Sequence, residues 1–119
     1  MKLLHCQRNG FDLVEQTRRA ELAKAAVCGA LRVPVAALNG TKGAPAVAQA
    51  RQVGYLLCRT ALGLSLPATS RAFRRTQATV WLGLKSLARR MQADEALRGL
   101  VEMLQTQLRI TVADTMGAE

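Results

Sequence analysis

The sequence predicts an all-α fold, a small multi-helix domain. Half of its 119 residues are hydrophobic but only four are aromatic, so leucine, alanine and valine must fill the core. Leucine and alanine favour helices, and clusters of β-branched residues, which favour strands, are scarce. In several stretches apolar side chains recur three or four residues apart, as they do along one face of a helix. The length suits a single domain.

The first predicted helix follows a short arm. We expect residues 1–11 to form a flexible arm, with a turn signal at Asn9-Gly10. Asp12 is predicted to cap a helix that ends near Leu31, and Glu15 completes an approximate capping box. The buried residues expected on this helix are Leu22, Ala26, Val27, Ala30 and Leu31, whereas Arg18, Arg19 and Lys24 are expected in solvent.

A brief helical turn and a longer helix are predicted next. The turn covers Val33 to Leu38, and a loop follows over residues 39–45. The loop segment Gly40-Thr41-Lys42-Gly43 is too short for a phosphate-binding P-loop and follows no strand, which excludes that motif. The long helix runs from about Ala46 to Leu62, with Gly63 placed to end it. Its predicted core face comprises Val53, Leu56, Leu57 and Ala61.

The stretch from Ser65 to Leu87 predicts a helix-turn-helix. Ser65 can cap a short helix with Pro67 in its first turn, and Thr76 can cap a longer one. Between them lies a basic turn, Arg74-Arg75. The second helix of such a motif normally lies in the DNA major groove. Its expected buried residues are Val80, Leu84, Leu87 and Met91, and Ala78, Leu82, Lys85, Ser86 and Arg89 are expected opposite them.

A last helix is predicted from Glu95 to about Arg109, capped by Asp94. Its apolar stripe comprises Leu97, Leu100, Val101, Leu104 and Leu108. We expect residues 110–119 to form a frayed tail. The helical domain therefore spans residues 12–109.

The charge of the chain is strongly positive and unevenly distributed. The formal net charge is +9, and from Leu22 to Ala93 there are eleven Lys or Arg residues and no Asp or Glu. Such a stretch attracts polyanions, either nucleic acid or an anionic membrane surface. Because it coincides with the predicted helix-turn-helix, nucleic acid is the favoured partner. For Arg59 and Arg71 we expect no more than a place on the solvated surface.

Several function classes are excluded on composition. Cys6, Cys28 and Cys58 form no metal-ligand spacing and His5 is the only histidine, so we expect no metal, no cofactor and reduced, mostly buried thiols. No nucleophile–base spacing suggests an enzyme. No apolar run reaches the length of a membrane span, and the N-terminus lacks a signal-peptide core. We therefore expect a cytoplasmic protein.

From about Glu21 to Leu108 the chain resembles the C-terminal DNA-binding domain of the bacterial chromosomal replication initiator DnaA. The segments that carry the resemblance are Val33–Leu38, Val47–Gln52, Tyr55–Leu57, Ser65–Pro67, Arg71–Phe73 and Thr79-Val80, with Asp94 at the start of the final helix. Nothing in the sequence resembles the ATPase module of the family. The resemblance implies a stand-alone relative, associated with the bacterial nucleoid, that binds double-stranded DNA through a helix-turn-helix.

The resemblance also implies which residues meet DNA. Arg51 fits an arginine that enters the minor groove in the family, and the residues from Arg74 to Val80 replace its base-reading run, one residue shorter. Arg75 and Thr79 are kept, whereas Thr76, Gln77 and Ala78 replace an aspartate, a histidine and a threonine. Base specificity is therefore expected to differ, with Gln77 suited to adenine and Ala78 to a thymine methyl group. The predicted DNA-binding residues are Lys42, Arg51, Pro67, Arg74, Arg75, Thr76, Gln77, Ala78, Thr79 and Lys85.

Three functions remain open from the sequence. The leading one is a DNA-binding protein involved in or regulating replication initiation. A second is a regulator that acts through protein contacts with the initiator or with the factor that inactivates it, suggested by Leu82 and by the few basic residues in the loop before the long helix. Trp81 fits either such an interface or, by preference, packing against a neighbouring helix. The third is a transcription regulator.

Overall fold

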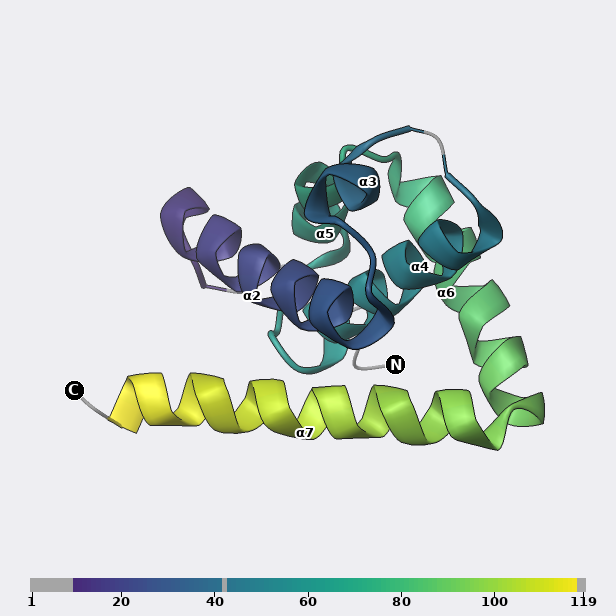
Figure 1. Cartoon of the computed structure of the whole chain (residues 1–119). Helices are drawn as coiled ribbons and strands as arrows, with labels where there is room; N and C mark the ends of the chain where they lie inside the picture. The colour runs from purple at the N-terminus through teal and green to yellow at the C-terminus, as the bar shows by residue number, and fades with distance from the viewer. Residues whose placement is uncertain (1–9, 42, 118–119) are drawn as a thin grey trace.

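The computed structural model describes residues 10–41 and 43–117. In these residues it contains helices and no strand, which confirms the predicted all-α fold. The helices in chain order are α2 (Leu13–Leu31), α3 (Val35–Asn39), α4 (Pro45–Thr60), α5 (Leu66–Phe73), α6 (Gln77–Ala93) and α7 (Glu95–Gly117) (Figure 1).

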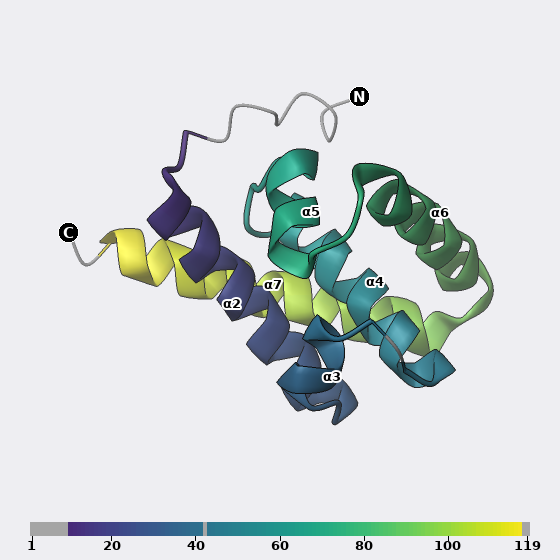
Figure 2. The same ribbon diagram turned by 90° about the horizontal axis from the view of Figure 1, so that it is seen from above.

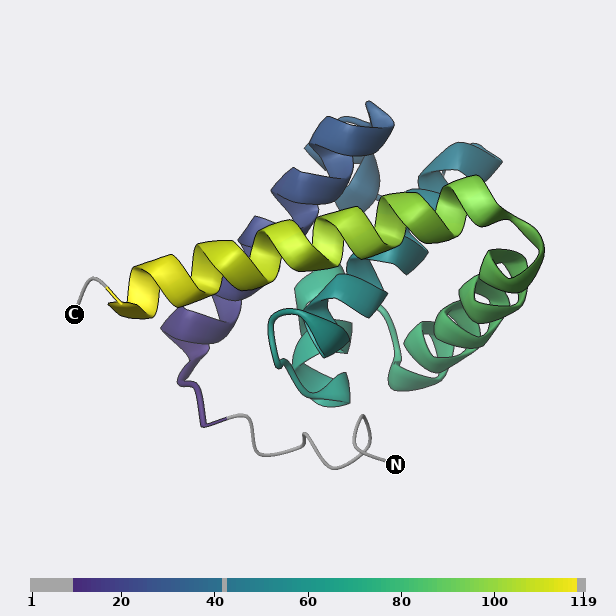
Figure 3. The ribbon, with the colours of Figure 1, turned by 90° about the horizontal axis from the view of Figure 1, so that it is seen from below.

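Helix α4 is the centre of the domain. It packs against each of the other described helices, α2, α3, α5, α6 and α7. Seen from above, α5 and α6 lie on one side of it and α2 and α3 on the other (Figure 2). Helix α7 crosses the underside as one long rod over α2, α4 and α6 (Figure 3). The helix-turn-helix, α5 and α6, is thus mounted on α4.

The predicted N-caps are present in the structure. Asp12, Ser65, Thr76 and Asp94 each accept a backbone N–H from the residue three positions later, at 2.8, 3.1, 3.1 and 3.0 Å. Each bond satisfies one amide that has no partner within its helix. The polar residues that punctuate the sequence therefore fix where four helices begin.

Two helical glycines allow α4, α5 and α6 to approach closely. A Cβ atom at Gly54 would lie 2.7 Å from the ring of Phe73, and one at Gly83 would lie 2.9 Å from the ring of Tyr55. The two rings themselves meet edge to face, with centroids 4.9 Å apart. Gly83 carries a helix-propensity cost of about 1 kcal/mol against alanine. The structure gives the reason for that cost, because only glycine leaves room for Tyr55.

The last helix is longer than expected. Its predicted stripe is buried or half-buried, but the helix continues from Arg109 to Gly117. Val112 extends the apolar stripe and packs, half-buried, against the core. The expected tail from Ile110 therefore begins as helix.

Basic residues lie inside the domain, which corrects three predictions. Arg19, Lys24 and Arg59 were expected in solvent, yet they are only 7%, 5% and 4% exposed. They donate to the carbonyl oxygens of Leu62, Ala72 and Leu64 at 2.9, 2.7 and 2.8 Å, respectively. These carbonyls lie at or just beyond the ends of α4 and α5, where no helical N–H is available to them. Arg71, by contrast, is exposed as expected, and of the buried set on α2 only Ala30 proves exposed.

The described cysteines are free thiols. Cys58 is fully buried, and burial raises the pKa of its thiol to about 12. Cys28 is half-buried, and burial also raises the pKa of its thiol. Both groups are therefore neutral at physiological pH. Cys6, like His5, lies outside the described residues.

Candidate nucleic-acid interface

The first turn of α6 is exposed and carries no acidic residue. Gln77, Ala78 and Thr79 all face solvent at the start of the second helix of the motif. The hydroxyl oxygen of Thr76 accepts the N–H of Thr79 at 3.1 Å, and the hydroxyl donates to Thr79 Oγ1 at 2.9 Å. Thr76 is therefore occupied as the N-cap. The side chains of Gln77 and Ala78 are exposed beside it.

An exposed stripe continues along α6 from this turn. Ala78, Leu82, Lys85 and Arg89 are exposed at a spacing of three or four residues, as the helical periodicity predicted. The opposite face holds Val80, Gly83 and Leu87, which are buried against the rest of the domain. Leu82 is 63% exposed, and Trp81 beside it is half-buried.

Arg74 occupies the turn in a left-handed backbone conformation, with φ at 54°. Its backbone N–H donates to the carbonyls of Ser70 and Arg71 and so closes the end of α5. A non-glycine residue in this conformation costs about 1 kcal/mol relative to glycine. The side chain is exposed, and its guanidinium group has no hydrogen bond or ion pair with any residue in 10–41 or 43–117.

Arg75 ties the turn to the α3–α4 loop. Its guanidinium group donates to the carbonyl of Gly40 at 2.6 Å, and weakly to those of Phe73 and Arg74 at 3.3 Å. The side chain is half-buried beside Tyr55. Burial raises the pKa of the Tyr55 hydroxyl, against the opposing effect of Arg75. Arg75 thus connects the turn to the α3–α4 loop, and part of its side chain remains exposed.

Arg51, which the resemblance assigns to the minor groove, lies within the domain in this structure. Its side chain is 8% exposed. It donates to the carbonyls of Leu38, Ala37 and Gly40 at 3.1, 2.8 and 2.8 Å. Burial, and then the nearby Arg75, lowers the pKa of Arg51. The carbonyl of Ala37 also accepts the backbone N–H of Gly40, and that of Gly40 also accepts from Arg75. Arg51 therefore adds a charged donor to the carbonyls that end α3.

The other predicted residues are only partly brought together. Arg74, Arg75 and residues 76–79 form one surface at the turn, and Lys85 extends it along α6. Pro67 is half-buried at the opposite end of α5 from the turn. Lys42 lies outside the described residues. Sequence reasoning missed Lys24, which reaches the end of α5 from α2 without any local signal, because its acceptor is 48 residues away.

Two kinds of feature are not found in the described part of the chain. None of its helices combines the length and apolarity needed to cross a lipid bilayer. Among residues 10–41 and 43–117, no His, Cys, Asp and Glu side chains gather in a group that could hold a metal ion.

Comparison with known proteins identifies the family. Residues 20–86 match the model of the bacterial DnaA protein helix-turn-helix, which is more than half of the chain. A crystal structure described as a DNA replication initiation factor superimposes with a TM-score of 0.73 at 22% sequence identity. The match covers 82% of this chain and 30% of that one, so this chain spans less than a third of that protein. The chain belongs to the bacterial DnaA helix-turn-helix family.

Proposed function

We propose that this protein binds double-stranded DNA with α6 in the major groove, and that it takes part in or regulates the initiation of chromosomal replication. The observation that carries the proposal is the exposed, acid-free first turn of α6. There Gln77, Ala78 and Thr79 face solvent beside Arg74. In a helix-turn-helix this turn supplies the side chains that reach base edges.

The proposed base recognition differs from that of the DnaA family. A glutamine can bond both N6 and N7 of adenine, and an alanine can contact the methyl group of thymine. We assign these roles to Gln77 and Ala78. Thr76 has no such role, because its hydroxyl is held in the N-cap. Arg74 and Lys85 would contact phosphates, which position the helix without reading sequence.

A salt titration of duplex binding tests this proposal. Fluorescence anisotropy should show affinity falling steeply as salt rises, because phosphate contacts release counterions. Lys85→Met should weaken binding to all sequences and reduce the salt slope by about one. The matched control is Arg109→Met, which removes the same charge from an exposed position on α7. No binding at low salt, or equal losses in the two variants, would refute the interface.

Sequence selection on a randomised duplex tests the reading residues separately. The selected site should contain an A·T pair whose preference is relaxed by Gln77→Ala, at a cost of about 1–3 kcal/mol in binding to that site. Lys85→Met should leave the selected site unchanged. A selected site that is indifferent to Gln77 would leave non-specific DNA binding as the function.

A second candidate function rests on Leu82. This leucine is 63% exposed in the middle of the α6 stripe, where an apolar side chain suits a protein contact better than a phosphate. The partner would be the replication initiator or the factor that inactivates it. Capture of either protein that survives nuclease treatment and is lost on Leu82→Gln supports this function. Loss of all captured protein on nuclease treatment would refute this function.

Binding at promoters rather than at the origin, seen by chromatin mapping, would instead indicate a transcription regulator.

A further inference from the structure

A polar pocket lies beside the helix-turn-helix, between α2, α5 and the end of α3. Its volume is about 330 Å³, and no described residue of α6 lines it. Lys24, Arg71 and Arg74 line it together with a single acidic residue, Glu21. Three cations and one carboxylate give the lining a formal net charge of +2. The pocket therefore favours an anion, and it shares only Arg74 with the surface that would bind DNA.

Lys24 is a buried cation held in place within this pocket. Its ammonium group donates to the carbonyl of Ala72 at 2.7 Å and lies 3.7 Å from a carboxylate oxygen of Glu21. It also lies 5.1 Å from the centre of the Phe73 ring. An ammonium group has three protons, and the carbonyl of Ala72 accepts one of them, whereas the Glu21 oxygen lies beyond hydrogen-bonding distance. A proton that Ala72 does not engage can donate to a ligand in the pocket, and the side chain loses little freedom on binding because it is already ordered.

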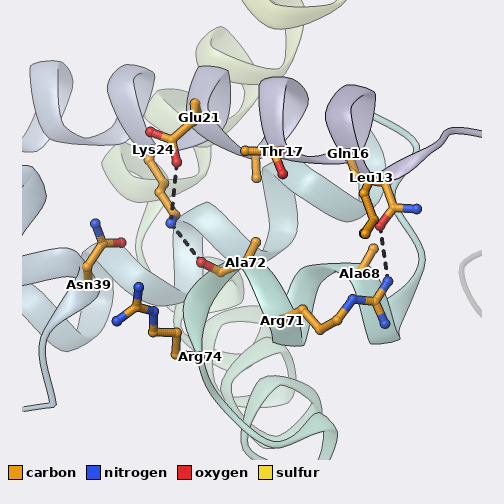
Figure 4. Close-up of a pocket in the computed structure, with 11 residues that line it drawn as sticks. Leu13, Gln16, Thr17, Glu21, Lys24, Asn39, Ala68, Arg71, Ala72 and Arg74 are labelled. Carbon is orange, nitrogen blue, oxygen red and sulfur yellow. Dashed lines mark hydrogen bonds and ion pairs between the residues drawn. The ribbon is translucent and has the colours of Figure 1, made fainter.

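Arg74 and Asn39 face the same part of the pocket as Lys24 (Figure 4). Arg74 is held at the turn in its left-handed conformation, and its guanidinium group has no partner among the described residues. Asn39 Oδ1 is buried and accepts no hydrogen bond there. A buried acceptor without a donor costs free energy until something supplies one. The site thus combines two cationic hydrogen-bond donors, Lys24 and Arg74, with one acceptor that has no donor, Asn39 Oδ1.

We propose that Lys24, Asn39 and Arg74 form a binding site for a phosphate monoester. The phosphate would lie between Lys24 and Arg74, where charge-assisted hydrogen bonds form from both sides. A hydroxyl group on the same ligand would donate to Asn39. A phosphate monoester carries a charge of about −1.5 to −2 at neutral pH, which matches the +2 of the lining better than the single charge of a carboxylate does.

Titration of the full chain with ribose 5-phosphate, followed by amide chemical shifts, tests the site. Sodium chloride holds the ionic strength constant, and inorganic phosphate and acetate are titrated in parallel. The amides of Lys24, Asn39 and Arg74 should shift and saturate with ribose 5-phosphate. Affinity should fall from ribose 5-phosphate to inorganic phosphate, and acetate should not saturate the site. Equal binding of acetate would overturn the phosphate site and point to a carboxylate of a protein partner.

Two arginine variants separate the pocket from general charge. Arg74→Gly should weaken ribose 5-phosphate binding at least tenfold and should fold well, because glycine adopts the left-handed conformation readily. The matched control is Arg32→Gly, since Arg32 is also exposed, ends α2 with φ at 57° and does not line the pocket. It should change affinity less than twofold. Equal losses in the two variants would overturn the site.

A duplex DNA titration distinguishes the source of the phosphate. Saturable shifts with ribose 5-phosphate support a free ligand. Shifts at the same three amides with duplex DNA and none with ribose 5-phosphate would overturn the monoester site, because a backbone phosphate is a diester with a single charge. Gln77→Ala should alter duplex selectivity and leave ribose 5-phosphate binding unchanged. Failure of the phosphate site and failure of DNA binding by α6 are therefore distinct results.

Discussion

The arginines of the interior and those of the helix-turn-helix turn use the same side chain in opposite ways. Arg19, Arg51 and Arg59 are buried and donate to backbone carbonyls at or beyond the ends of helices. Arg74 is exposed at the turn, and its guanidinium group has no described partner. The net charge of +9 is therefore not a count of the cations that face a ligand. Part of it stabilises the fold.

The difference follows from how the helices end. The last carbonyls of a helix have no intrahelical donor, and they need a partner from elsewhere in the chain or from solvent. A long cationic side chain reaches across to such carbonyls and also favours the negative end of the helix dipole. Arg51 does both at the end of α3, where three carbonyls accept from it. No carboxylate is needed in that arrangement.

The largest expected effect comes from removing an interior arginine. Arg51→Met should lower the free energy of unfolding by about 3 kcal/mol, because three charge-assisted hydrogen bonds are lost and only the carbonyls of Ala37 and Gly40 keep another donor. Urea denaturation measures this, and Arg109→Met, the exposed control, should change stability by less than about 0.5 kcal/mol. A variant as stable as the parent that binds DNA more weakly would instead show that Arg51 leaves the interior to enter the minor groove.

A smaller effect of opposite sign is expected at the turn. Arg74→Gly should raise the free energy of unfolding by about 1 kcal/mol, since glycine adopts the left-handed conformation without strain. Arg32→Gly at the end of α2 should give a similar gain, because its backbone has the same conformation. The two variants should differ only in ligand binding. A loss of stability in Arg74→Gly would mean that its side chain supports the fold, and the contrast with Arg51 would fail.

The sequence predicted the fold well because its signals are local. Four polar caps, the 3.6-residue periodicity and the turn residues act over a few positions, and the structure confirms the helix starts that they predict. The partners of the buried cations are not local. Arg19 and Lys24 donate to carbonyls 43 and 48 residues away in the sequence. The local sequence of α2 therefore predicts that these side chains are exposed, and only the tertiary structure shows their partners.

The same limit applied to the candidate site. Ala78 and Lys85 are exposed on α6 as the helical pattern predicted, whereas Ser86, expected on the same face, is half-buried. Arg51 was assigned to DNA by resemblance to the family, and its burial follows from where α3 ends against α4. The pocket around Lys24 joins three separate elements, and no spacing within any one of them indicates it.

The smallest expected effect concerns Glu15, which links an interior arginine to a surface one. Its carboxylate accepts from Arg19 at 2.8 Å and from Arg18 at 2.7 Å, and these bonds lower the pKa of Glu15 from 4.5 to about 2. A carboxyl group whose pKa is depressed on folding stabilises the protein above its unfolded pKa and loses that contribution as pH falls through the folded value. Stability should therefore decline between about pH 4.5 and pH 2, measured by urea denaturation across this range. Glu15→Gln should flatten that part of the profile, because the amide does not titrate.

Since Arg19 keeps its bond to the Leu62 carbonyl at every pH, the loss of stability on acidification should be well below the loss in Arg51→Met. A decline of equal size would mean that the interior arginines depend on their acidic partner and not on the helix ends.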